Sequence, residues 1–468
     1  MQSYRSNRSL GIILGVLALS CCSPGLCGEA LGRDNQTLPV SSETSVVKIY
    51  SRARECYRKD DLKGAIAALN VTLNDNPKRA NAFALRAACY ERLHDYRRAA
   101  ADYSSYLLRV PTGDWVRWGR ARSYYELGQY EMALDDWSRY TEIEYLSREC
   151  FELRADTFAL LGHYDKAILD MNDALAMPRN IGALSKSNSR VMFCLTLDAV
   201  KNWDAKIRKS PHRAELYIGR AICRGLIQQY KEAEADATLA LALNSKLVEA
   251  YQIRALSYAQ QNDLQRSLAE FDKAIKLAPN SATTYILLAQ SYINCRQAEQ
   301  GFDDLKKRLL KDGKNTNLLL AHAELANYLR NNDVAVADVS KAISIDPTIM
   351  SAYYARANYY QELGKPTQAA EDYTRCIKLD PTAFKSYRQR AACYVEMKEF
   401  EKAAQDLTKM IAMHEHCEWY RARSHCYEKL GKKDLAAKDR QRVAELDSVG
   451  NPLAGIFGDA KRAARDAI

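Results

Sequence analysis

The sequence contains little glycine and proline, the two residues that most often interrupt helices. They number 20 and 11 among 468 residues, whereas Ala and Tyr are frequent and the charges alternate in short runs. A glycine-rich phosphate loop, a Gly-x-Ser-x-Gly elbow and a His-Glu-x-x-His motif are all missing from the sequence. Composition and motifs therefore predict helices throughout, and they favour a non-catalytic protein without a cofactor over an enzyme.

The sequence also lacks a long apolar run. Its longest, Leu10–Leu19, has about half of the ~20 residues that a helix needs to span a bilayer. Charge of one sign is not concentrated either, because 58 acidic residues are dispersed among 68 basic ones, and nucleic-acid binding needs a concentrated positive face. We therefore expect no transmembrane helix in the mature chain and no nucleic-acid partner.

Residues 1–28 have the outline of a secretory signal peptide. Arg5 and Arg8 precede the apolar run, and small residues follow it. The stretch ending at Cys21 and Cys22 is similar to a bacterial lipoprotein signal, in which a cysteine just after the apolar run is acylated. The match is imperfect, and ordinary cleavage near Cys27 or Gly28 is the favoured interpretation. Both readings predict export to the bacterial periplasm or cell envelope, and the lipoprotein reading adds a lipid anchor at Cys21 or Cys22.

One small residue recurs at an interval of 34 residues along most of the chain, which is typical of repeat proteins. The interval shortens to 32 and 33 residues at two places, so one frame covers residues 46–448 in about twelve units. The units start near residues 46, 80, 114, 148, 180, 214, 248, 282, 316, 350, 384 and 417. A polar linker (29–45) precedes this array, and a C-terminal capping helix or tail (449–468) follows it. The recurring residues are Ala65, Ala99, Ala133, Ala167, Ala199, Ala233, Ser267, Gly301, Ala335, Ala369, Ala403 and Ala436.

The unit from Ser351 to Pro381 shows the pattern inside each repeat. Arg356 and Ala357 lie on a first helix, Gly364 marks a turn, and Ala369 lies on a second helix before the closing proline. With this order of small residue, Tyr, turn Gly, Ala, aromatic and Pro, the chain resembles the tetratricopeptide repeat family. The resemblance implies an all-α, right-handed superhelical solenoid of tandem helix-turn-helix repeats. It also implies that the first helices line a concave groove that binds proteins or peptides.

Two units depart from this pattern. The unit over residues 180–213 lacks the turn glycine and most aromatic residues, and the unit over residues 282–315 has Gly301 and Arg308 where Ala is usual. Most of the remaining units keep an Arg just before the small residue of the first helix and an acid sixteen residues later. Such pairs predict structural ion pairs between helices, because a guanidinium can bind a carboxylate with two hydrogen bonds.

The candidate binding site lies on the stripe of the first helices that packing within a unit leaves free. In the first three units this stripe combines aromatic rings with guanidinium groups, which dominate protein-binding hot spots and favour an acidic or aromatic peptide. The alternative is that some of these residues only cover the exposed first unit. The residues are Tyr50, Arg54, Tyr57, Arg58, Arg92, Trp115, Trp118, Arg122 and Tyr125.

The same stripe changes character in the middle of the array. There it is apolar, and it would suit an amphipathic helix. The residues that form this floor are Ile218, Ile222, Leu226, Leu256, Ile286 and Ile293.

The body cysteines and one histidine cluster remain. Most cysteines occur singly without a Cys-x-x-Cys pair and are expected to be small buried residues. Imidazoles and a thiolate at short spacing, in His414, His416, Cys417 and His425, form a weak candidate for a zinc or copper site. The favoured interpretation is that His414 and His416 lie in a loop between units and hold no metal.

Together these patterns predict a non-catalytic scaffold or adaptor of the bacterial envelope that binds other proteins or peptides. The alternative is an accessory or substrate-holding subunit of an envelope glycan-processing enzyme, in which Trp115 and Trp118 stack on sugar rings.

Overall fold

The computed structural model describes residues 40–111, 113–143, 148–177 and 199–448, and within them it contains α-helices and no strand. The chain divides into two compact units, one formed by residues 128–381 and one by residues 1–127 with 382–468. The predicted signal peptide, the anchor candidates Cys21 and Cys22, and the tail over 449–468 lie outside the described residues. The expected all-α repeat fold is confirmed in the described part.

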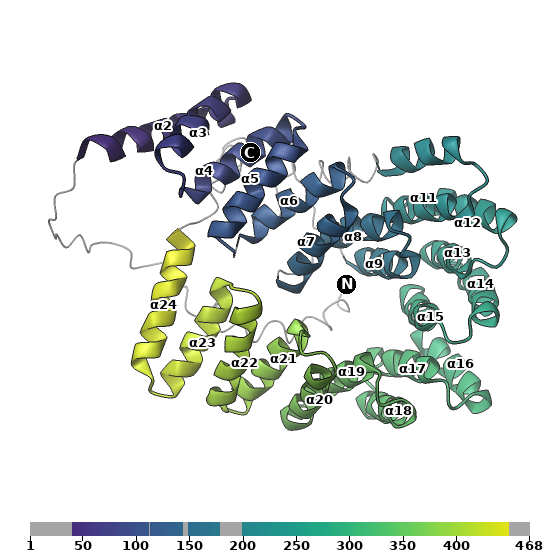
Figure 1. Cartoon of the computed structure of the whole chain (residues 1–468). Coiled ribbons are helices and arrows are strands. Elements are labelled where there is room, and N and C mark those ends of the chain that lie inside the picture. Colours follow the sequence, from purple (N-terminus) through teal and green to yellow (C-terminus); the bar gives the residue numbers. More distant parts are fainter. Residues whose placement is uncertain (1–39, 112, 144–147, 178–198, 449–468) are drawn as a thin grey trace, which may run out of the picture. The chain divides into compact units, whose positions relative to one another are not determined.

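The helices form successive antiparallel pairs joined by short turns (Figure 1). A further helix covers residues 199–209. In the unit of residues 1–127 and 382–468 the helices are α2 (Val40–Arg58), α3 (Leu62–Asp75), α4 (Ala80–Arg92), α5 (Tyr96–Arg109), α6 (Asp114–Glu126), α21 (Phe384–Glu396), α22 (Phe400–Met413), α23 (Cys417–Lys429) and α24 (Lys433–Ser448). In the unit of residues 128–381 they are α7 (Tyr130–Ile143), α8 (Arg148–Leu160), α9 (Tyr164–Ala176), α11 (Ala214–Leu226), α12 (Tyr230–Leu243), α13 (Val248–Gln260), α14 (Leu264–Leu277), α15 (Ala282–Asn294), α16 (Ala298–Lys311), α17 (Thr316–Tyr328), α18 (Asn332–Ile345), α19 (Met350–Glu362) and α20 (Pro366–Leu379).

The helix starts follow the interval found in the sequence. First helices begin at residues 80, 114, 148, 214, 248, 282, 316, 350, 384 and 417. The first of all, α2, begins at Val40, within the stretch assigned above to the linker over 29–45. Helix ends are the least constrained part of a helix, so the sequence pattern marks them within a few residues only.

The turn inside each pair depends on one left-handed residue. Gly128, Gly162, Gly364 and Gly431 occupy this position with φ between 65° and 81°, where a Cβ would be strained. Other pairs place a residue with a side chain there, such as Lys398 with φ of 61°. The turn therefore forms without glycine, and the missing turn glycine of a unit is no argument against its helices.

The small residues lie where helices cross. Ala167, Ala233 and Ala369 are fully buried, and so are Ala221, Ala255 and Ala357 on the partner helices. The departure at Gly301 has a specific cause, since a Cβ built there would lie 2.4 Å from Cγ of the Tyr292 ring. In this pair the ring of Tyr292 occupies the space that a methyl group fills elsewhere.

The predicted ion pairs between the two helices of a unit are confirmed. Arg356 donates from Nε and Nη2 to the two carboxylate oxygens of Asp372, at 2.8 and 2.7 Å, and its Nη1 donates to Ser340 Oγ on the preceding second helix at 2.9 Å. Arg356 therefore connects three helices. Equivalent forks join Arg86 to Asp102, Arg154 to Asp170, Arg220 to Asp236, Arg390 to Asp406 and Arg423 to Asp439.

Two units build this pair differently. At the arginine position of α15 the chain has Leu288, and Arg308 of α16 donates instead to Asp304 at 2.9 Å and to Asp272 at 2.8 Å. In α17 the position holds His322, whose Nδ1 lies 2.6 Å from Asp338. The unusual Arg308 therefore supplies the guanidinium that its first helix lacks.

Candidate protein-binding surfaces

The aromatic part of the predicted site on α2 is covered by neighbouring side chains. Tyr50 and Tyr57 are only 9% and 7% exposed. The guanidinium carbons of Arg79 and Arg92 lie 4.3 and 5.2 Å from the centroids of the two rings, respectively. Burial raises the pKa of Tyr50 to about 12. Both rings therefore serve packing, as the alternative interpretation of the sequence allowed, and they present little area to a ligand.

Two arginines of the predicted site remain exposed. Arg92 donates from Nη2 to Asp60 at 2.6 Å, and Arg58 lies 3.7 Å from Glu55. The side chains of these pairs keep between 39% and 69% of their area exposed. Exposed ion pairs of this kind contribute only about 0–1 kcal/mol, so the carboxylate of a ligand can replace the internal one at little cost.

Arg122 extends this surface onto α6. Its Nη1 lies 3.2 Å from Glu91, which also accepts a hydrogen bond of 2.6 Å from the hydroxyl of Tyr103. Burial raises the pKa of Glu91, and Arg122 and Tyr103 partly offset that shift. Arg122 is thus a structural partner of Glu91 as well as a candidate contact.

The remaining predicted residues of this surface are half-buried where their side chains are described. Arg54 is half-buried, and its Nε is buried without a hydrogen-bond partner. Trp118 and Tyr125 are half-buried on α6. The side chain of Trp115 lies outside the described residues. The role of these residues in binding stays a prediction.

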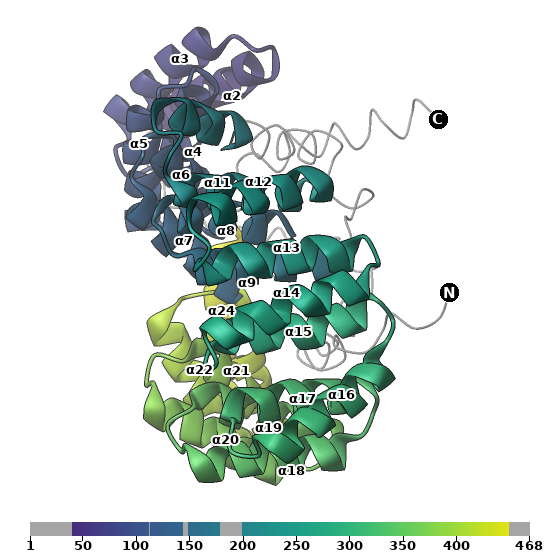
Figure 2. The same ribbon diagram turned by 90° about the vertical axis from the view of Figure 1, so that its right-hand side faces the viewer.

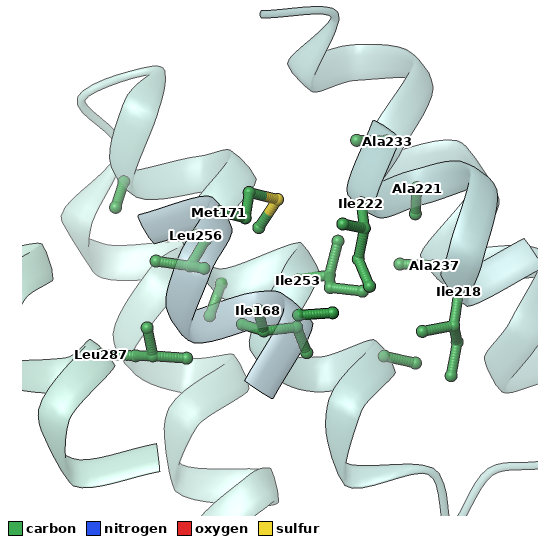
Figure 3. Close-up of a cluster of buried hydrophobic side chains, with 14 of the residues drawn as sticks. Ile168, Met171, Ile218, Ala221, Ile222, Ala233, Ala237, Ile253, Leu256 and Leu287 are labelled. Carbon is green, nitrogen blue, oxygen red and sulfur yellow. The ribbon is translucent and has the colours of Figure 1, made fainter. Parts of the chain in front are cut away.

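The apolar floor predicted in the middle of the array is covered by a helix of the same chain. Helix α9 contacts α11, α13 and α15, and its Ile168 and Met171 lie among Ile222, Ile253 and Leu256 (Figure 3). All five side chains are buried. The floor is therefore a helix-binding surface, and the helix that it holds is α9.

The covered part of this floor has clear limits. Ile218 and Leu226 are fully buried, whereas Ile286 is 37% exposed and Ile293 is half-buried. The sequence placed all of these residues on one stripe but gave no reason to expect α9 there. One signal in the sequence could have predicted this contact. Helix α9 has two apolar residues, Ile168 and Met171, beside the residues that face α8, and they form a second apolar face.

The histidine cluster at the start of α23 has structural roles. A ring nitrogen of His416 accepts a hydrogen bond of 3.2 Å from the amide of Glu418 and so caps the helix. The ring of His425 packs edge-on against Phe400, and Arg421 lies 3.7 Å from the sulfur of Cys417. His414 is half-buried. Across the described stretches no three His, Cys, Asp or Glu side chains are grouped so that they could hold a metal ion, so the geometry gives the metal hypothesis no support.

The cysteines at the repeated position are buried thiols. Cys89, Cys223 and Cys426 are fully buried. Burial raises the pKa of Cys89 to about 12 and that of Cys426 to about 11. At neutral pH these thiols are protonated, and they act as small packing residues.

The described part of the chain also has no helix that is long and apolar enough to cross a membrane.

Stacked antiparallel helix pairs, with small residues at their crossings and a helix-binding surface on the first helices, define an α-helical repeat protein. The tetratricopeptide repeat family matches residues 248–281 and 351–383, and the described helix pairs between and around these stretches begin at nearly the same interval. The chain is a tetratricopeptide repeat protein. Proteins with this repeat are generally protein-interaction scaffolds.

Similar proteins match this chain at low identity. Human Sperm-associated antigen 1 is 24% identical over 281 residues, which are 55% of this chain and 29% of that protein. Human DnaJ homolog subfamily C member 7 is 24% identical over 325 residues, which are 65% of this chain and 61% of that protein. The chain thus spans less than two thirds of these relatives. Among solved structures, yeast Tom70 has 17% identity and a TM-score of 0.37, with 91% of this chain and 97% of that chain covered.

Proposed function

We propose that this protein is a non-catalytic scaffold that binds acidic segments of other proteins along the surface formed by α2, α4 and α6. The observation that carries the proposal is the continuity of cationic groups on that surface. Arg92 of α4 lies over the ring of Tyr57 of α2, and Arg122 of α6 contacts Glu91 of α4. Arg58 is the last residue of α2, two residues before Asp60.

The ion pairs of this surface are suited to exchange. Asp60 is more exposed than Arg92, with 69% against 43% of its side-chain area. An incoming carboxylate would replace Asp60 while Arg92 keeps its position over the Tyr57 ring. Arginine held in this way is partly ordered before binding, which lowers the entropy cost of recognition.

We further propose that the protein acts in the bacterial envelope. The support is the pattern of residues 1–28, with Arg5 and Arg8 before an apolar run and Cys21 and Cys22 after it. Fractionation of cells that make the full chain tests this, with the mass of the N-terminal peptide as the readout of acylation. Recovery of uncleaved protein from the cytosol would refute export.

Affinity capture from an envelope extract tests the binding surface. The double variant Arg58→Glu, Arg92→Glu reverses two charges on first helices, and Lys63→Glu, Arg97→Glu makes the same change in net charge at exposed positions of α3 and α5. We expect the first variant to capture at least tenfold less protein than the unaltered chain. The second variant should capture as much protein as the unaltered chain. Equal capture by both variants would remove this surface from consideration.

The same experiment separates the alternative function. If the protein holds glycans for an envelope enzyme, the captured material contains polysaccharide, and Trp118→Ala abolishes its capture while the charge reversal leaves it unchanged. Capture of protein segments that depends on Arg58 and Arg92 favours the scaffold.

A further inference from the structure

Helix α9 buries two different faces. One face joins α9 to α8 as in other pairs, with Ala167 at the crossing and Asp170 accepting both hydrogen bonds of the Arg154 fork at 2.6 and 2.7 Å. The other face carries Ile168 and Met171, which are 0% and 2% exposed. Its burial comes from contact with α11, α13 and α15, the first helices of three successive pairs.

The second helices α12 and α14 make a simpler set of contacts. Helix α12 packs on α11 and on α13, and α14 packs on α13 and on α15. Helices α13, α14 and α15 accordingly lie side by side (Figure 2). The position of α9 across three first helices is therefore that of a bound helix laid along their common surface.

The fit between α9 and this surface is close. Gly225 of α11 leaves room for the side chain of Met171, because a Cβ built at Gly225 would lie 2.7 Å from Met171 Sδ. At the start of α9, the charged neighbours of Tyr164 are Glu215 and Arg213 beside the start of α11 and Glu249 at the start of α13. Burial raises the pKa of Tyr164 to about 12.

The other end of α9 has an unfavourable feature. Asp173 of α9 lies near Glu324 of α17, and burial together with the charge of Asp173 raises the pKa of Glu324 to about 7. Asp173 also raises the pKa of Arg154 on α8, so its carboxylate lies near one charge of each sign, and the contribution from Glu324 is the repulsive one. A helix with the same apolar residues and a neutral or basic residue at this position would lack the repulsion.

We propose that the surface of α11, α13 and α15 is a second binding site, which takes an amphipathic helix from another protein and is held by α9 until that helix displaces it. The partner helix has apolar residues at the positions of Ile168 and Met171 and a neutral or basic residue at the position of Asp173. The inference does not depend on the surface of α2, α4 and α6. Because α9 is part of the same chain, its effective concentration is high, and it weakens binding of any helix added in solution.

A labelled synthetic peptide tests the site. The probe has the sequence of residues 163–177 with Asp173→Lys, and its binding to the full chain is followed by fluorescence anisotropy. The chain variant Ile168→Ala, Met171→Ala weakens the hold of α9 without altering α11, α13 or α15. We expect the probe to bind this variant at least tenfold more tightly than the unaltered chain, and a probe with Ile168→Asp and Met171→Asp to bind neither.

A disulfide that locks α9 gives an independent test. The variant Met171→Cys, Gly225→Cys brings two cysteines within reach, since Cγ of Met171 lies 3.8 Å from a Cβ built at Gly225. We expect the oxidised protein to bind the probe at least tenfold more weakly than the same protein after reduction. Met171→Cys alone, treated in the same way, controls for oxidation elsewhere.

The outcomes of these tests either support or overturn the second binding site. Tighter binding by the weakened variant with a loss on locking supports the proposal. Equal binding by the oxidised and reduced double-cysteine protein overturns it, because the probe would then bind elsewhere. Absence of binding to a reduced protein whose circular dichroism shows an intact fold overturns it as well. If Ile168→Ala, Met171→Ala unfolds the chain, the disulfide variant decides alone.

Discussion

The pairs α8–α9 and α19–α20 follow the same local rules and yet end in different surroundings. Both have a guanidinium fork between their helices, from Arg154 to Asp170 and from Arg356 to Asp372. Both turn at a glycine with positive φ. Helix α9, however, lies on the surface of three later first helices. The comparison teaches that the repeat pattern determines the pair and leaves the neighbours of the pair open.

The largest expected effect tests whether the two forks are equivalent. Arg154→Leu and Arg356→Leu each leave a carboxylate that is 8% exposed without its main partner, and removal of one member of a buried pair costs about 3–5 kcal/mol. We expect both variants to lower the free energy of unfolding by that amount, measured by urea denaturation and circular dichroism.

The matched controls are Arg154→Lys and Arg356→Lys, which keep the charge and lose the fork, and they should lose less. A clearly smaller loss for Arg154→Leu than for Arg356→Leu would mean that the contact with α11, α13 and α15, and not the fork, holds α9 in place.

The second prediction concerns pH and only the α8–α9 side of the comparison. The pKa of Glu324 is about 7 in the folded chain, against the model-compound value of 4.5 for an unperturbed glutamate. The folded state therefore binds the proton more tightly than the unfolded state. The protonated carboxyl of Glu324 adds its full contribution to the free energy of unfolding below about pH 4.5. This contribution is lost as pH rises through 7.

Glu324→Gln should remove this part of the pH dependence. We expect the difference in unfolding free energy between pH 5 and pH 8 to shrink by about 1–3 kcal/mol. Asp173 of α9 raises the pKa of Glu324, and Glu324 raises the pKa of Tyr359 of α19. Asp173→Asn should therefore give a smaller change in the same direction as Glu324→Gln. An unchanged pH profile in Glu324→Gln would show that α9 and α17 do not come together in this way.

The smallest expected effect tests the turns. Gly162→Ala and Gly364→Ala meet no atom within 4 Å, so only the φ values of 81° and 65° oppose the added Cβ. We expect each to cost about 1 kcal/mol, measured as a shift of the urea midpoint. Lys398→Gly, at φ of 61° in another pair, should stabilise the fold and shift the urea midpoint upward. A much larger loss of stability in Gly162→Ala than in Gly364→Ala would indicate that the α8–α9 turn also helps to position α9 on α11, α13 and α15.

Much of the fold could be predicted because its determinants are local. Ala369 recurs because two helices cross there, and Arg356 recurs because its fork reaches Asp372 sixteen residues later. The contact of Arg356 with Ser340 could have been found by the same periodic reasoning, since both residues belong to the repeat frame. The candidate site was less predictable, because Tyr50 and Tyr57 lie on the expected helix but are covered by Arg79 and Arg92 of later segments.

By itself the sequence determined the helices, their pairing and the arginine forks, because these depend on residues within about one repeat of each other. Only the tertiary structure decided which apolar surface is open and which is filled. Ile222 and Leu256 belong to a stripe that any helical assignment would expose, and Ile168 covers them because α9 folds back across three pairs. That contact joins residues from separate repeats, and no periodic pattern in the chain specifies it.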